Sequence, residues 1–252
     1  MTDTGTYLYA VTEESPPVPN LRGVAGTPVR TIPCAGLIAY VSTVSLDEFG
    51  AEPLKRSMEN LEWLGQTAGA HHDVVEEVAE RLPTAPVRLV TVYRGDEQVR
   101  ELLRERHDDF VDVLDHVAGR REWGVKAYVD LTVETTDVTA GGGGPGTAYL
   151  KKRQAGLRSR EEAWRAAVGQ AERLHDILSS VAVASHRHRA QDPELSGRKE
   201  PMILNGAYLV ELDRDGEFTR AVEGLRGEGV DVELTGPWAP YSFSDLEVRG
   251  DG

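Results

Sequence analysis

The 252-residue sequence has few of the features that mark secreted, membrane-spanning or disulfide-bonded proteins. Cys34 is its single cysteine, which excludes an internal disulfide and fits a reducing compartment. No apolar run approaches the length that crosses a bilayer, and the opening residues 1–4 lack the basic start of a signal peptide. We therefore expect a soluble, cytoplasmic protein without a membrane among its partners.

The motifs of common active sites are also missing. The sequence contains no Gly-x-Ser-x-Gly elbow, Walker phosphate loop or Rossmann glycine fingerprint. The glycine run 141–144 is not followed by Gly-Lys-Ser/Thr, so we interpret it as a flexible loop. His186 and His188 are too few to hold zinc without a distant carboxylate. We therefore expect that the protein is not an enzyme and binds no cofactor or metal. The alternative is a small-molecule enzyme or a ligand-binding protein on a ferredoxin-like scaffold.

Positive charge is scarce: the sequence has 28 basic and 42 acidic residues, and its net charge is −14. This balance argues against nucleic acid as the main partner, including the RNA that four-stranded sheets bind on exposed aromatics. The charge is uneven, with −10 over residues 1–118, +3 over 119–200 and −7 over 201–252. A solvated helix face explains the basic middle most simply; intramolecular complementarity and a partner patch are the alternatives. Acidic helix pairs such as Glu76-Glu77 are likewise interpreted as solvated.

Hydrophobic periodicity predicts an α+β protein of two domains, residues 1–121 and 122–252. The expected strands cover residues 6–11, 37–41, 86–93, 122–133, the second half of 181–189, 202–210 and 230–234. The expected helices cover residues 54–82, as one helix or as two with a break near Gly65 or Gly69, and residues 99–117, 148–179 and 218–225. From residue 122 the order is strand, helix, strand, strand, helix, strand, which is the ferredoxin-like split βαβ arrangement. The first domain is looser and could borrow the strand at 122–133.

The predicted helix at 148–179 is longer than usual for a globular domain and suggests projection beyond its own sheet. An apolar seam recurs every seven residues from Leu150, and its later members are expected to be buried: Leu157, Trp164, Ala171 and Leu178. Its first turns hold Lys151, Lys152 and Arg153, whose charges oppose the helix dipole. Local helix stability therefore does not explain these cations.

The segment at 236–243 combines three aromatic residues with two prolines, in the order Gly-Pro-Trp-Ala-Pro-Tyr-Ser-Phe. Such a segment is extended and presents its rings at low entropic cost. It either folds back onto its own sheet or forms a docking surface for another protein. The candidate partner-binding residues are Trp238, Pro240, Tyr241, Phe243, Tyr208, Lys151, Lys152 and Arg153.

Seven segments, in this order, resemble the gas vesicle GvpL/GvpF family. They lie at residues 7–11, 63–75, 86–88, 122–126, 149–153, 204–210 and 236–243. The family usually has proline where this chain has Ala239, which loosens one turn. The resemblance implies two α+β domains, the N-terminal one of modified ferredoxin-like form. It also implies a non-enzymatic accessory protein that binds the GvpA shell protein and other accessory gas vesicle proteins during nucleation and assembly.

Overall fold

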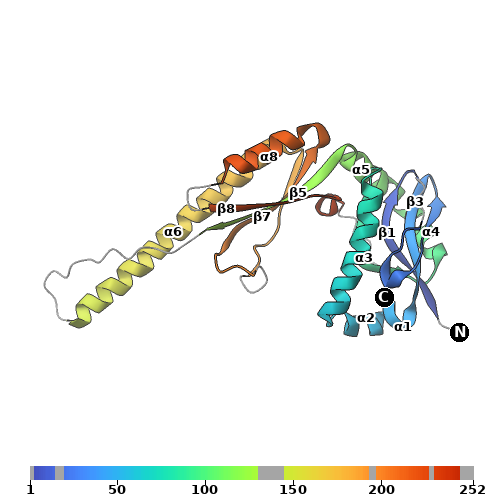
Figure 1. Ribbon diagram of the computed structural model, residues 1–252, viewed down its shortest axis with the longest axis horizontal. Helices are drawn as coiled ribbons and strands as arrows, with labels where there is room; N and C mark the ends of the chain where they lie inside the picture. Colours follow the sequence, from blue (N-terminus) through green and yellow to red (C-terminus); the bar gives the residue numbers. More distant parts are fainter. Residues whose placement is uncertain (1–2, 15–19, 130–144, 193–196, 227–229, 245–252) are drawn as a thin grey trace. The chain divides into compact units, whose positions relative to one another are not determined.

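The computed structural model describes residues 3–14, 20–129, 145–192, 197–226 and 230–244, without the side chains of 145–157, 159 and 160. The chain divides into two compact units, Met1–Glu122 with Pro237–Gly252, and Trp123–Gly236. Each unit contains a four-stranded antiparallel sheet (Figure 1), so the α+β class with two ferredoxin-like-type units is confirmed.

Four strands and five α-helices lie in the described residues of the first unit. Its elements are β1 (Thr4–Thr12), η1 (Val24–Gly26), β2 (Val29–Cys34), β3 (Leu37–Ser45), α1 (Leu46–Phe49), α2 (Ala51–Ser57), α3 (Leu61–Ala79), β4 (Ala85–Tyr93), α4 (Asp96–Glu105), α5 (His107–Val117) and η3 (Tyr241–Phe243). The second sheet is built from β5 (Arg120–Val129), β6 (Ala184–Arg187), β7 (Met202–Glu211) and β8 (Val230–Trp238), with α6 (Pro145–Val181), η2 (Leu212–Arg214) and α8 (Asp215–Gly224).

The first sheet has the strand order β2-β3-β1-β4 and is covered on both faces. α1, α3 and η1 pack on one face, and α4 and α5 pack on the other (Figure 1). β1 carries a bulge between Leu8 and Ala10. Alternation places Leu8 in the α4–α5 core and Tyr7 and Tyr9 in the α3 core, and the bulge then leaves Tyr9 and Ala10 on the same face. A strand buried on both sides needs a nearly continuous apolar sequence, which β1 has.

The prediction for the first sheet missed β2 and was wrong to consider borrowing the strand at 122–133. β2 pairs with β3 from Val29↔Ser42 to Cys34↔Leu37, and it completes the sheet. Pro33 is tolerated because β2 is an edge strand, where one backbone N–H needs no partner in the ladder. β5, which begins at Arg120, belongs to the second sheet.

The second sheet has the order β6-β7-β5-β8, which is the ferredoxin-like order for a β-α-β-β-α-β chain. α6 and α8 contact each other and cover the same face. The core between helices and sheet includes Trp123, Leu178, Tyr208 and Phe218. The indole Nε1 of Trp123 also donates a hydrogen bond to Oδ1 of Asp215 at 2.9 Å, which fixes the start of α8 against β5.

α6 is longer than the sheet that it covers. Its 37 residues span about 55 Å, whereas the ten residues of β7 span about 33 Å. Burial follows Ala167, Ala171, Leu174, Leu178 and Val181. The predicted burial of Ala171 and Leu178 is confirmed, but the burial of Trp164 is wrong, because its side chain is 46 % exposed. The side chains of Leu150 and Leu157 lie outside the described residues.

The structure also differs from the predicted domain limits at the C-terminal end. The prediction assigned all of 122–252, including the tail at 236–243, to the second domain. In the structure, the chain from Pro237 groups with the first unit. Ala239 and Tyr241 contribute to the core under α3, and that apolar contact explains the difference.

Candidate functional site

The tail that follows Gly236 is bound to the first unit by two carboxylates. The backbone N–H of Ala239 donates to Oε1 of Glu76, on α3, at 2.7 Å. The backbone N–H and the hydroxyl of Ser242 donate to Oε2 and Oε1 of Glu122, both at 2.7 Å. Glu122 is itself buried. Hydrogen bonds to a carboxylate are shorter and stronger than neutral ones, so this arrangement fixes the course of the tail. We call these residues the tail clamp: Glu76, Glu122, Ala239 and Ser242.

Tyr241 lies beside a buried histidine in the α3 core, with 6.2 Å between the ring centroids of Tyr241 and His71. The Tyr7 hydroxyl accepts a hydrogen bond from the Val90 N–H at 2.9 Å and lies 3.0 Å from Nδ1 of His71. Burial lowers the pKa of His71 to about 4, so its imidazole is neutral near pH 7. Burial and the nearby carboxylates raise the pKa of Tyr241. These groups hold a packed aromatic core rather than a reactive centre.

Trp238 is the tail ring with the largest exposed fraction, 41 %. Its ring contacts His72 edge to face, with 5.3 Å between centroids. His72 lies on α3 one turn before Glu76, and its Nε2 is 3.9 Å from Oε1 of that carboxylate. The tail clamp and His72 therefore hold an exposed indole on a fixed backbone.

The other predicted partner-binding residues are less exposed than Trp238, or their side chains lie outside the described residues. Pro240 is buried, and Tyr241 and Phe243 are half-buried. Tyr208 does not fit the predicted partner-binding role, because its side chain is fully buried in the second unit. Its hydroxyl lies 3.0 Å from Nδ1 of His175. Its alternating position in β7 places it on the helix-covered face. Lys151, Lys152 and Arg153 lie on α6, but their side chains are outside the described residues.

The sequence interpretation missed the tail clamp. Glu76 was interpreted as one of a solvated pair, and Glu122 was not singled out. A signal was present for Glu122, because a carboxylate directly before Trp123 in an apolar strand has to find a partner when it is buried. Nothing near Glu76 in sequence distinguishes it from Glu77, which pairs with Arg81 instead.

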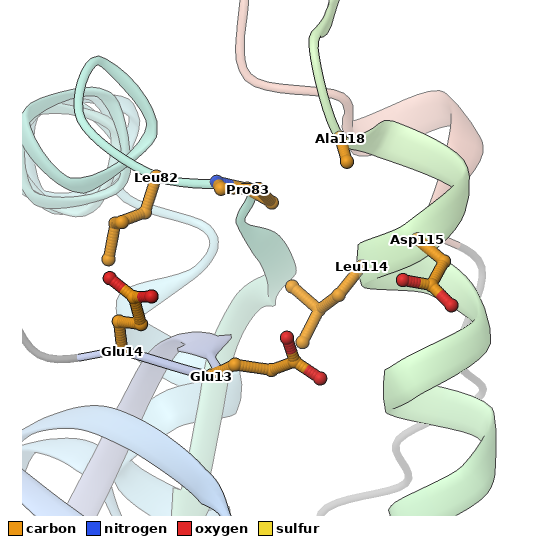
Figure 2. Close-up of a pocket in the computed structure, with 7 residues that line it drawn as sticks. All are labelled: Glu13, Glu14, Leu82, Pro83, Leu114, Asp115 and Ala118. Atoms are coloured by element: carbon orange, nitrogen blue, oxygen red, sulfur yellow. The ribbon is translucent and has the colours of Figure 1, made fainter.

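The first unit also contains a small open pocket of about 130 Å³. It is lined by Glu13, Glu14, Leu82, Pro83, Leu114, Asp115 and Ala118. In Figure 2 the Glu13 carboxylate points toward Leu114, and the Glu14 carboxylate points toward Leu82. The lining contains three carboxylates and no serine, cysteine, histidine or lysine, so these residues do not form a nucleophile–base pair of the Ser–His or Cys–His kind.

Within the described residues, neither a metal site nor a membrane-spanning helix is present. No group of three or more His, Cys, Asp or Glu side chains is arranged to hold a metal ion within the described ranges. None of the described helices combines the length and apolarity needed to cross a membrane. Trp238, exposed on the clamped tail, is the candidate site.

Known proteins match this chain along nearly its whole length. The family model for gas vesicle synthesis protein GvpL/GvpF matches residues 5–245. Gas vesicle protein L of Streptomyces sp. (strain CB03234) is 39 % identical over 97 % of this chain and 94 % of its own length. Gas vesicle protein F of the same strain is 26 % identical over 94 % of this chain and 98 % of its own length. The crystal structure of GvpF from Anabaena sp. PCC7120 has the same fold, with a TM-score of 0.72, 20 % identity and 99 % coverage of both chains.

Proposed function

The chain belongs to the gas vesicle GvpL/GvpF family, and from this premise we propose that it is a non-enzymatic accessory protein of gas vesicle assembly. In this role it binds the GvpA-type shell protein and other accessory gas vesicle proteins during nucleation or growth, in the cytoplasm and at the gas vesicle. The family description, gas vesicle synthesis, supports an assembly role. The greater identity to protein L than to protein F of one Streptomyces strain supports an L-type role.

The exposed indole of Trp238 is the observation that supports partner binding. Tryptophan residues contribute strongly to interfaces because they bury a large area and lose few rotamers. The backbone next to Trp238 is already ordered in the free protein, because the N–H groups of Ala239 and Ser242 donate hydrogen bonds to Glu76 and Glu122. Binding therefore costs little further conformational entropy at this ring. A shell subunit that will face gas has apolar surface to shield from water before it assembles. A fixed, exposed indole fits such a surface.

The test uses Trp238→Ala in the full chain, with pull-down of the purified shell protein and thermal unfolding measured on the same sample. We expect affinity to fall about 30-fold, equivalent to about 2 kcal/mol. We expect a stability loss below the roughly 3–5 kcal/mol of a fully buried tryptophan, because the ring is partly in water.

Leu212→Ala is the matched control, because Leu212 is an exposed large apolar residue in the other unit, with 50 % of its side chain accessible. This variant should bind the shell protein like the wild type. Unchanged binding by Trp238→Ala, or an equal loss in both variants, contradicts the role proposed for Trp238.

A further inference from the structure

The surface of α3 extends from Trp238 toward a second exposed apolar residue, Leu61. Ala239 binds Glu76 and Trp238 contacts His72 one turn earlier, so the indole lies nearer the N-terminus of α3 than the rest of the clamped tail. Leu61, the first residue of α3, is 82 % exposed. Leu61 and His72 are about three helical turns apart, so they lie on one face of α3, separated by about 16 Å along its axis.

The helix surface between these two residues is bare. Gly65 follows Leu61 by one turn on the same face, and Gly69 follows one turn later. Both glycines are exposed, and a Cβ at either position would meet nothing within 4 Å among the described residues. Glycine weakens a helix relative to alanine, and packing inside the first unit does not require it here. A surface without side chains lets a second helix approach α3 closely.

A line of carboxylates runs beside this apolar line. Residues 59–80 contain six acidic residues and no lysine or arginine. Glu62 directly follows Leu61 and Asp73 directly follows His72, so both lie about 100° further round the helix, on the same side. Both are exposed. The face of α3 that points away from the sheet (Figure 1) therefore has an apolar line with a negative edge.

The neighbouring cations do not neutralise this edge. Lys55 and Arg81 are already in ion pairs with glutamates of their own segments. Arg22, before the η1 turn that contacts α3, donates to a backbone carbonyl. Arg56 is exposed on α2, five residues before Leu61. Charge complementarity along α3 itself therefore favours a cationic partner.

We infer that α3 and Trp238 form one docking surface for a cationic amphipathic helix of the partner protein. The inference rests on the proposed function, in which Trp238 binds that partner, and it adds the chemistry of the segment that is bound. Apolar side chains at i, i+3, i+4 and i+7 of the partner helix pack on Trp238 and Leu61 and over the two glycines. Lysine or arginine on one edge of that helix pairs with Glu62 and Asp73.

Two other occupants are less compatible with the negative edge. Two copies of α3 packed through this line would each bring a row of carboxylates to the contact, and like charges oppose such pairing. An anionic membrane surface would repel the same row. A cationic helix satisfies both the apolar line and its edge.

The experiment uses the full chain and two synthetic helical peptides of about 18 residues, or five turns. Both have leucine at the a and d heptad positions and alanine elsewhere, except that one carries lysine and the other glutamate on the polar face. Isothermal titration calorimetry measures binding in about 50 mM NaCl, where charges are weakly screened. We expect the lysine peptide to bind and the glutamate peptide to bind at least about 10-fold more weakly.

A steric variant tests the position of the bound helix. Gly65→Gln combined with Gly69→Gln places side chains on the bare surface without changing the charge. We expect affinity for the lysine peptide to fall about 10-fold or more, because the helices can no longer approach closely. Thermal unfolding checks that the fold is intact, and the midpoint should be unchanged or higher, because glutamine forms helix better than glycine. Trp238→Ala should lower peptide affinity by about 10-fold or more as well.

A charge variant with a matched control separates docking from general attraction to an acidic chain. Glu62→Gln combined with Asp73→Asn should lower affinity for the lysine peptide about 5-fold. The control is Glu101→Gln combined with Glu105→Gln, which removes two exposed carboxylates from α4, on the other face of the same sheet. It changes the net charge by the same amount and should bind like the wild type.

Several results would overturn the inference. They are no binding of the lysine peptide, equal binding of both peptides, equal loss in the two charge variants, or full binding by the glutamine variant. A concentration-dependent dimer that the glutamine variant abolishes would assign the surface to a second copy instead. Binding only to vesicles of phosphatidylglycerol would assign it to a membrane.

The inference and the proposed function fail separately. If pull-down of the shell protein depends on Trp238 but the lysine peptide does not bind, this inference alone fails. If the peptide binds as expected but Trp238→Ala leaves pull-down of the shell protein unchanged, the role of Trp238 in the proposed function fails and the surface serves another cationic partner.

Discussion

Glu122 accepts two hydrogen bonds from Ser242, a residue that lies 120 positions later in the chain. Both donor–acceptor distances are 2.7 Å, and the carboxylate is buried. A buried carboxylate depends on such donors, because without them its lost hydration is uncompensated.

Replacing this carboxylate should destabilise the first unit. We expect Glu122→Gln to lower the free energy of unfolding by about 1.5–3 kcal/mol, the usual value of buried hydrogen bonds to a charged group. Urea unfolding followed by circular dichroism measures this change. Glu80→Gln, on the exposed end of α3, is the control and should stay within about 0.5 kcal/mol of the wild type. A Glu122→Gln protein as stable as the control would contradict the importance of the clamp.

His71 should make stability depend on pH. Its folded pKa is about 4, below the usual 6.5 of a histidine, so the unfolded chain binds more protons between these two pH values. Stability therefore rises with pH from about 4 to 6.5, by up to about 3 kcal/mol from this group, and is lost as pH falls. The His71→Gln variant should show a shallower dependence in urea unfolding at several pH values. NMR titration of the His71 imidazole offers a direct check, and protonation above about pH 6 would be the contradicting result.

Gly23 and Gly65 should respond oppositely to alanine. A Cβ at Gly23 would lie 2.0 Å from the Tyr9 hydroxyl oxygen, which accepts from the Val24 N–H and donates to Ser42. We expect Gly23→Ala to cost more than about 2 kcal/mol, because it overpacks a buried hydrogen-bonded ring. A Cβ at Gly65, inside α3, meets nothing within 4 Å. Gly65→Ala should stabilise by about 0.5–1 kcal/mol, and thermal unfolding would show the two shifts in opposite directions.

Arg30 and Asp96 connect β2 to the start of α4. The two terminal guanidinium nitrogens of Arg30 donate to the two carboxylate oxygens at 2.8 and 2.6 Å, and the Thr6 hydroxyl donates at 2.8 Å. The Arg30 hydrogen bonds hold the pKa of Asp96 below its usual value. Arg30→Met should cost about 1 kcal/mol at pH 7, because the pair is partly solvated. This stabilisation is present above the unfolded pKa of an aspartate and is lost as pH falls through the lowered value. A variant whose stability difference persists at pH 2 would contradict this assignment.

Much of the fold could be predicted from alternation and periodicity. β4, β7 and β8 follow strong apolar patterns, and the order of elements from residue 120 onward gives the ferredoxin-like sheet. β2 was missed because Thr31 and Pro33 make its sequence look like a loop, and its pairing with β3 is a tertiary property. The burial of Trp164 was wrong because heptad spacing gives the direction of a side chain but not where the covering sheet ends.

The candidate site was predictable in composition but not in location. The prolines and aromatics of the tail indicated an extended, preorganised segment. The two carboxylates that hold the tail come from residues 163 and 120 positions earlier in the chain, beyond the reach of local patterns. Tyr208 was misassigned for a related reason, because the alternation of β7 shows two faces without telling which one the helices cover.

The clamp has a consequence for synthesis of the chain on the ribosome. The first unit includes the tail, so its final element emerges 120 residues after Glu122. At about 5–20 residues per second, this interval is roughly 6–24 s. During that time the aromatic core under α3 lacks Ala239 and Tyr241, and both clamping carboxylates lack their backbone donors. Vectorial folding of the first unit thus ends only when translation of the second is complete.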